Sequence, residues 1–241
     1  MEKFFKLGTI ESRIKGGNIS QERRRQDPEK YRSLGCKVRK VFRAPEYSAA
    51  FAELVGIILG DGAISNYQVR ITLDRWRDRD YAVFVADLMV NVLGVAPSLA
   101  VRECDNTISL TLSGIALVEM LENFGMKRGN KIVHQVSFPQ WVKNDLELSV
   151  ACVRGLFDTD GGLYFHQKNK KKYLGWCFAS RSAPLLADVQ NTLRKMDFNV
   201  KKSGGYKLYM YRLSSIERYL YLVGSHNPKN SRKVEFYHCQ R

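Results

Sequence analysis

The sequence is constrained most by a nine-residue pattern that occurs twice. Residues 54–62 read LVGIILGDG, and residues 153–161 read VRGLFDTDG. Both segments have a glycine at the third position, a largely apolar middle and a terminal Asp-Gly pair. Each one ends an expected helix and is followed by segments with strand-like alternation. An internal repeat of this kind predicts two structurally related halves.

A glycine inside each of the two expected helices indicates that these helices pack closely. Gly56 and Gly155 occupy the same place in the repeat, and glycine in a helix costs about 1 kcal/mol relative to alanine. Small residues allow two helix backbones to approach each other. We therefore expect a two-fold-like crossing in which Gly56 faces Gly155. Both helices would then end side by side and bring Asp61 and Asp160 together.

Both halves show the same expected order of elements: helix, two strands, helix, two strands, helix. The first half is expected to have helices at 48–59, 78–93 and 113–124 and strands at 63–65, 68–73, 99–104 and 107–112. The second half is expected to have helices at 145–160, 184–196 and 214–223 and strands at 163–167, 173–179, 199–202 and 207–213. These elements predict an α+β fold made of two related repeats.

The expected domains are two repeats preceded by a basic segment. The repeats cover residues 45–141 and 142–241, and the second one includes a C-terminal tail. Residues 1–44 are polar and show no sustained helical periodicity. We expect them to form an extended basic arm with a short helix near residues 28–34. Whether this arm contacts a partner or has no specific role stays open.

Net charge points to a polyanionic partner. The chain carries a formal net charge of +15, of which residues 1–44 contribute +8, residues 45–163 contribute −5 and residues 164–241 contribute +12. Neutralising phosphates releases condensed counterions, so a basic excess of this size favours nucleic acid. A basic protein without such a partner and a membrane-surface protein are the alternatives.

Other features of the composition exclude several classes of protein. The 5 cysteines form no C-x-x-C pair, which argues against a disulfide framework and against a zinc cluster. No apolar run reaches the roughly 20 residues of a membrane-spanning helix, and the N-terminus lacks the apolar core of a secretory signal. We therefore expect an intracellular globular protein, in a compartment that the sequence does not specify.

Two carboxylates at adjacent helix C-termini require positive charge nearby. A helix C-terminus carries partial negative charge, and Asp61 and Asp160 would also repel each other. Carboxylates and free backbone carbonyls are the oxygen ligands that magnesium and calcium prefer. Two such cations activate water and stabilise the leaving oxygen in phosphodiester hydrolysis. The alternative is that both aspartates are ordinary turn residues before glycine.

Both motifs resemble those of the LAGLIDADG family of homing endonucleases, and the resemblance extends over residues 45–235. It implies two pseudo-two-fold-related αββαββα repeats, whose motif helices form the interface and whose curved antiparallel sheets form a saddle on the DNA major groove. It also implies that Asp61 and Asp160 are catalytic and bind metal, together with the backbone carbonyls of Gly60 and Thr159. Two motifs in one chain imply a monomer with an asymmetric target.

The two motifs depart from the family pattern at a few positions. The first has Leu59 where the family often has an earlier aspartate, whereas the second has Asp158. Because this position is not shared, we interpret Asp158 as a structural or supporting residue. Arg154 is polar where alanine is usual, and Val153 replaces leucine. Neither is expected to touch the catalytic aspartates.

The resemblance also implies basic residues near the metals, which would offset transition-state charge. The position after the last helix of each half points to Lys131 in the first half and Lys233 in the second. Lys229 is an alternative to Lys233, because the loops of the two halves differ in length. A solvated surface lysine is the other interpretation for each of them.

Side chains opposite the apolar positions of the strands are expected to face DNA. In the first half these residues are Gln68, Arg70 and Thr72, with Arg75 and Arg77 just beyond. In the second half they are Tyr164, His166, Lys168, Tyr173, Arg181 and Arg212, with the hairpin lysines Lys170 and Lys172 on phosphates. Arginines are the better candidates for base edges, since they pair bidentately with guanine. We assign four aromatic residues to the core: Trp176, Phe178, Tyr209 and Tyr211.

The expected function is that of a site-specific homing endonuclease, free-standing or intron-encoded. It would use Mg²⁺, with Ca²⁺ or Mn²⁺ as substitutes in binding, to break both strands of a long asymmetric DNA target. An RNA-splicing maturase that binds intron RNA and a non-cleaving DNA-binding protein on the same fold are the alternatives. The presence of both motif aspartates favours the enzyme. The target sequence cannot be read from these residues, because base readout also depends on DNA bending.

Overall fold

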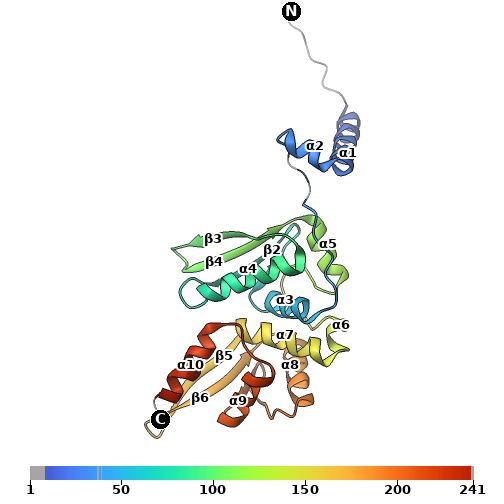
Figure 1. Ribbon diagram of the computed structural model, residues 1–241. Coiled ribbons are helices and arrows are strands. Elements are labelled where there is room, and N and C mark those ends of the chain that lie inside the picture. The colour runs from blue at the N-terminus through green and yellow to red at the C-terminus, as the bar shows by residue number, and fades with distance from the viewer. Residues whose placement is uncertain (1–8, 37, 39, 240–241) are drawn as a thin grey trace, which may run out of the picture. The chain divides into compact units, whose positions relative to one another are not determined.

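The computed structural model describes residues 9–36, 38 and 40–239, without the side chain of Lys168 (Figure 1). The chain divides into two compact units, Met1–Val41 and Phe42–Arg241. Within the described ranges, no helix is both long and apolar enough to cross a membrane.

The described part of the N-terminal unit contains the helices α1 (Ile10–Gln26) and α2 (Pro28–Ser33). Helix α2 agrees with the short helix expected near residues 28–34, but the expectation of an extended arm is wrong, because α1 is helical over 17 residues. Thr9 caps α1 by accepting a hydrogen bond from the backbone N–H of Ser12 at 3.3 Å. No residue of α1 is buried. Its polar side chains therefore leave no hydrophobic periodicity from which a helix is predicted.

The first repeat of the larger unit has the expected order of elements. Its helices are α3 (Ala49–Leu59), α4 (Arg79–Leu93) and α5 (Ile115–Asn123). Its strands are β1 (Gly62–Ile64), β2 (Gln68–Asp74), β3 (Ser98–Arg102) and β4 (Thr107–Ser113). They form an antiparallel sheet in the order β1-β2-β4-β3.

The second repeat has the same topology. Its helices are α6 (Gln140–Lys143), α7 (Leu146–Thr159), α8 (Ala183–Lys195), α9 (Leu213–Leu222) and α10 (Pro228–Cys239). Its strands are β5 (Gly161–Lys168), β6 (Lys171–Ala179), β7 (Lys201–Ser203) and β8 (Lys207–Met210), in the antiparallel order β5-β6-β8-β7. The expected C-terminal tail is instead the helix α10, and the short α6 was not expected. The α+β class with two αββαββα repeats is confirmed.

Helices α3 and α7 begin at the residues that the sequence predicts. The hydroxyl of Ser48 accepts a hydrogen bond from the N–H of Phe51 at 3.3 Å, and the carboxylate of Asp145 accepts one from the N–H of Leu148 at 3.1 Å. Both are favoured N-cap residues. The two helices lie side by side at the centre of the unit, with one sheet on each side (Figure 1).

The two motif glycines let the backbones of α3 and α7 touch. A Cβ atom on Gly56 would lie 2.1 Å from the carbonyl oxygen of Cys152, and one on Gly155 would lie 2.3 Å from that of Glu53. Close approach at both glycines is confirmed. Each glycine lies nearest to the residue three positions before the other, and a Cβ atom on Gly155 would also lie 2.9 Å from the backbone nitrogen of Ile57, which follows Gly56. That relation is itself two-fold, because Cys152 and Glu53 are equivalent in the repeat.

A buried ion pair also joins the two motif helices. Arg154 of α7 donates from Nη2 and Nε to Oε2 of Glu53 of α3, at 2.9 and 3.0 Å. The Glu53 side chain is 3% exposed, and its other oxygen lies 2.6 Å from Nδ1 of His226. A buried carboxylate is tolerated only when it is paired. The polar residue that departs from the family pattern is therefore the partner of an acid on the opposite helix.

Replacing Gly56 with alanine is expected to destabilise the larger unit by about 3 kcal/mol, because the added methyl group overlaps a backbone carbonyl that cannot move aside. The three tryptophans, Trp76, Trp141 and Trp176, all lie in this unit, so urea unfolding followed by their fluorescence measures the change. Gly17→Ala in α1 is the matched control, since its Cβ would meet nothing within 4 Å. An unchanged midpoint for Gly56→Ala would contradict the close contact.

Candidate metal centre and nucleic-acid interface

The C-terminal ends of α3 and α7 meet directly. A Cβ atom on Gly60 would lie 2.0 Å from the hydroxyl oxygen of Thr159, so a larger residue at position 60 would force the Thr159 side chain to move. Thr159 turns that hydroxyl back to its own helix, donating to the carbonyl of Gly155 at 2.9 Å. The next residue in each motif is its aspartate. The structure therefore brings Asp61 and Asp160 to one place, as the sequence predicts.

Asp61 and Asp160 are two partly buried carboxyl groups that lie close to each other. Burial, followed by the negative charge of Asp160, raises the pKa of Asp61 from 3.8 to about 6. Burial also raises the pKa of Asp160, whereas the ammonium group of Lys131 opposes that rise. Both carboxylates are thus held in a site where their charged forms are penalised. Positive charge placed between them would remove the penalty.

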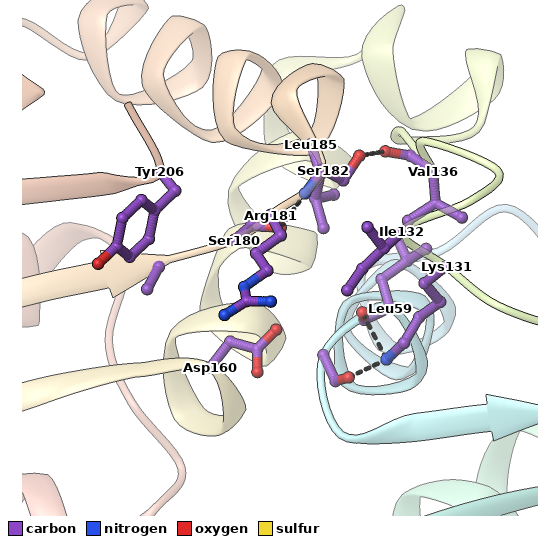
Figure 2. Close-up of a pocket in the computed structure, with 12 residues that line it drawn as sticks. Leu59, Lys131, Ile132, Val136, Asp160, Ser180, Arg181, Ser182, Leu185 and Tyr206 are labelled. Atoms are coloured by element: carbon purple, nitrogen blue, oxygen red, sulfur yellow. Dashed lines mark hydrogen bonds between the residues drawn. The ribbon is translucent and has the colours of Figure 1, made fainter. Parts of the chain in front are cut away.

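Lys131 already supplies one cation to the end of α3. Its ammonium group donates to the carbonyl of Leu59 at 3.0 Å and makes a short hydrogen bond to the carbonyl of Gly60 (Figure 2). Burial lowers the pKa of Lys131, and the charges of Asp160 and Asp61 act in the opposite direction. The free carbonyls at this helix end therefore bind positive charge, which is the behaviour that a metal ligand requires.

In the second repeat the equivalent contact is made by Lys229. Its ammonium group donates to the carbonyl of Asp158 at 3.1 Å, and Asp158 is the counterpart of Leu59 in the repeat. Lys229 also pairs with Asp78 at 3.1 Å, and its charge lowers the pKa of Asp61. Lys233 instead donates to the carbonyl of Leu163 at 2.6 Å. Of the two lysines considered from the sequence, Lys229 occupies the position that matches Lys131.

Asp158 holds the loop that delivers Lys229. Its carboxylate accepts hydrogen bonds from the N–H groups of His226 and Asn227, at 2.7 and 3.2 Å, and a short one from the hydroxyl of Ser225. Burial raises the pKa of Asp158 to about 6, whereas the hydrogen bonds from Ser225 and His226 lower it. Asn227 in turn donates to Asp78 at 2.7 Å. Asp158 thus fixes the segment before α10, a contact that no local pattern in the sequence indicates.

The ligands available for a metal are two carboxylates and backbone carbonyls. Within the described residues, no group of three or more histidine, cysteine, aspartate or glutamate side chains is arranged to hold a metal ion. A site of oxygen donors with few carboxylates suits magnesium, which keeps several of its waters, better than zinc. Asp61, Asp160 and the helix-end carbonyls fit that requirement.

A pocket of about 350 Å³ opens beside Asp160. Its lining includes Lys131, Arg181 and Tyr206, which come from three different segments. The guanidinium group of Arg181 points toward the Asp160 carboxylate in the close-up view (Figure 2). Arg181, expected from the sequence to contact DNA, therefore lies next to the candidate metal centre.

The outer face of the first sheet carries polar side chains. Arg70 and Thr72 are exposed, Gln68 is partly exposed, and the alternate residues Val69 and Ile71 are buried. The register places Thr111 and Ser109 of β4 opposite Arg70 and Thr72. This face therefore offers mainly hydrogen-bonding groups, as the alternation predicts.

Two arginines follow this strand. Arg75 pairs with Glu103 at 2.9 Å and lies over the ring of Trp76. Arg77 is exposed, and its backbone N–H donates to Asp74 at 2.7 Å.

The outer face of the second sheet carries aromatic side chains. Tyr164, His166 and Tyr173 lie on it as expected, but the assignment of Tyr209 and Tyr211 to the core is wrong. Tyr211 is 50% exposed, and Tyr209 is only partly buried. In β8 it is Leu208 and Met210 that point to the core, so the alternation runs opposite to the one assumed. Trp176 and Phe178 are buried as predicted.

The remaining predicted contacts lie at the edges of this sheet. Lys170 and Lys172 are exposed at the tip of the β5–β6 hairpin, whereas the side chain of Lys168 lies outside the described part of the chain. Arg212, expected on a strand, is instead the N-cap residue of α9 and is exposed, because β8 ends at Met210.

Comparisons with known proteins agree with this architecture. Residues 147–224 match the family model of the LAGLIDADG-like domain. No curated protein sequence matches the chain.

Solved structures share the fold over most of both chains. The homing endonuclease I-DmoI in complex with DNA and Ca is 16% identical, with a TM-score of 0.53 over 79% of this chain and 98% of that one. I-DmoI with DNA and Mn is 17% identical, with a TM-score of 0.50 over 74% and 98%. Full-length DUF199/WhiA from Thermatoga maritima is 16% identical, with a TM-score of 0.51 over 81% and 67%.

At these identities the structural likeness establishes the fold, and the domain match covers the second repeat. The second repeat thus contains a LAGLIDADG-like domain, and the larger unit has the fold of the LAGLIDADG proteins of known structure.

Proposed function

We propose that this protein is a site-specific homing endonuclease that hydrolyses both strands of a DNA duplex. The observation that carries the proposal is the meeting of Asp61 and Asp160 at the touching ends of α3 and α7. Two like charges held together in a partly buried place are unfavourable unless a cation binds there. A binding protein without catalysis has no need for such an arrangement.

The proposed metal ligands are Asp61, Asp160 and the backbone carbonyls of Gly60 and Thr159. A divalent cation, for which we propose Mg²⁺, supplies an activated water and stabilises the leaving oxygen. I-DmoI, which shares the fold, has been solved in complex with DNA and Ca and in complex with DNA and Mn, which supports the use of a divalent cation. The chain itself contributes the negative charge that attracts the cation and the rigid helix ends that fix its ligands.

Lys131 and Lys229 are the proposed cationic partners of this centre. Each reaches the equivalent helix-end carbonyl of its own repeat, so the two positive charges flank the aspartates from both sides. In that position they offset negative charge that develops on a phosphodiester. Lys233, which contacts Leu163 further along β5, is the less favourable candidate.

The two sheets are the proposed DNA-binding surfaces. Two different repeats in one chain give two different faces, so we propose that the protein acts as a monomer on a long, asymmetric duplex. The basic residues that surround the faces suit phosphate contacts. An intron-encoded or free-standing gene that promotes its own copying is the biology we propose for such an enzyme.

Asp61 is expected to make the metal-free protein less stable as the pH rises. Its folded pKa of about 6 exceeds the ordinary value of 3.8, so the folded state holds this proton more tightly. The stabilisation is present at low pH and is lost between about pH 4 and pH 6. Asp61→Asn removes the titration, and at pH 7.5 in EDTA it should be more stable than the wild type by on the order of 2 kcal/mol.

Urea unfolding of both proteins between pH 4.5 and 7.5 measures this difference. Adding Mg²⁺ at pH 7.5 should stabilise the wild type and leave Asp61→Asn unchanged. A stability difference that does not vary with pH would contradict the crowded-carboxylate site.

Asp61→Asn and Asp160→Asn should each reduce double-strand cleavage by at least about a hundredfold, because each removes a proposed metal ligand. Duplex binding should stay within about threefold of the wild type, since neither side chain lies on a sheet face. The matched control is Asp87→Asn, which neutralises an exposed carboxylate on α4 and should cut normally. A plasmid library that spans the insertion site of the gene, incubated with Mg²⁺ or with EDTA, supplies the substrate.

The other functions give different results in the same experiment. A non-cleaving DNA-binding protein would bind duplex without any Mg²⁺-dependent cut. A maturase would instead bind structured intron RNA and leave every duplex intact. Full cleavage by either asparagine variant would contradict the proposal that the replaced aspartate is a metal ligand required for cleavage.

A further inference from the structure

Five rings form one continuous surface on the outer side of the second sheet. We call it the aromatic face, and it consists of Tyr164, His166, Tyr173, Tyr209 and Tyr211. Each ring contacts at least one other, and the separations between ring centres run from 5.5 Å for His166 and Tyr211 to 6.3 Å for Tyr164 and Tyr209. A patch of this kind on a polar, basic surface calls for an apolar partner.

The strand register places these rings on one side. Tyr164 lies opposite Gly175, and His166 lies opposite Tyr173, while Tyr209 pairs with Cys177. A Cβ atom on Gly175 would come within 2.7 Å of the Tyr164 ring. The glycine therefore lets that ring lie down against the strand, so that the face is smooth.

The rings of the aromatic face pack against one another and do not stand apart as separate surfaces for stacking. Tyr209 and Tyr211 are nearly parallel, at 8°, and His166 and Tyr173 are inclined by 25°. Nδ1 of His166 is buried between the rings and has no hydrogen-bond partner in the described part of the chain. Stacking of unpaired bases needs open ring faces. A packed surface suits methyl groups that touch it from outside.

The outer face of the first sheet differs in chemistry at the matching place. There Arg70, Thr72 and Thr111 present hydrogen-bonding groups. In the major groove only thymine adds an apolar group, its 5-methyl, and apolar side chains are its usual contacts. Lys201 is exposed and lies opposite Tyr209 in the register, and Lys170 is exposed at the tip of the β5–β6 hairpin. Their charge complements the phosphates on either side of a groove.

We propose that the aromatic face recognises thymine methyl groups in the half of the duplex target that lies against the second sheet. The proposal rests on the proposed DNA-binding function and adds its chemical specificity. The other half of the target would be read through hydrogen bonds from the first sheet. The two halves of the DNA target would therefore be recognised by different kinds of contact, apolar contacts in one half and hydrogen bonds in the other.

The test begins with selection of duplexes from a random library by the full chain in Ca²⁺. Tyr211→Ala and Thr72→Ala then identify the two halves, because each variant should relax the sequence preference in one half only. The half that responds to Tyr211→Ala is expected to be rich in thymine. Replacing its thymines with deoxyuridine removes only the methyl groups, and it should weaken wild-type binding about fourfold for each methyl that is contacted.

The same substitution in the other half should leave the affinity unchanged. In Tyr211→Ala the difference between thymine and deoxyuridine should shrink toward onefold, whereas Tyr211→Phe, which keeps the ring and loses the hydroxyl, should retain it. Since Tyr211 is 50% exposed, neither variant removes a core residue.

Three results would overturn the proposal. Equal binding of thymine and deoxyuridine duplexes by the wild type would exclude methyl recognition. Loss of the preference in Tyr211→Phe would assign the contact to the hydroxyl. Tighter binding of single-stranded oligonucleotides than of duplex would make the face a stacking surface. Failure to select any duplex is a different outcome, since it would reject the proposed DNA-binding function itself.

Discussion

The backbone contact between α3 and α7 is the constraint on which the candidate site depends. Gly56 and Gly155 remove the side chains that would otherwise separate the helices, so each backbone meets a carbonyl of the other. Gly60 then lies against Thr159, and the aspartates that follow must share one place. Carboxylates repel each other, and the packing of the hydrophobic core around these helices helps to hold them together. The fold thereby holds the two carboxylates in an unfavourable electrostatic arrangement, which the proposed cation would relieve.

The two repeats are alike in backbone and different in side chains. Lys131 comes from the loop after α5, whereas its counterpart Lys229 comes from the start of α10. The second repeat needs Asp158 to fix the loop that carries Lys229, and this explains why only the second motif has an acid at that position. The same divergence separates the two sheet faces, one polar and one aromatic. A pseudo-symmetric scaffold thus presents two distinct surfaces.

Sequence reasoning located the motif helices because two signals agreed there, apolar residues at helical spacing and glycines at a repeated position. It missed α1 because no side chain of that helix is buried, and hydrophobic periodicity exists only where a helix packs. It placed Tyr209 and Tyr211 in the core because aromatic residues usually belong there. In the sequence, the two tyrosines alternate with the apolar Leu208 and Met210, and this alternation was the signal that places the tyrosines on the outer face of the sheet. The sequence pointed to Lys233 with Lys229 as the alternative, whereas Lys229 is the one that reaches the helix end, because loop conformation decides which ammonium group does so.

The sequence by itself determined the repeat, the order of elements, the fold class and the two aspartates, because each depends on residues that lie near one another along the chain. The tertiary structure alone decided which carbonyl each lysine reaches, that Glu53 pairs with Arg154 across the helix interface, and that five rings gather on one face. Those relations join residues that are distant along the chain. They arise from strand register and helix crossing, which the packing of the whole core sets and no local pattern encodes.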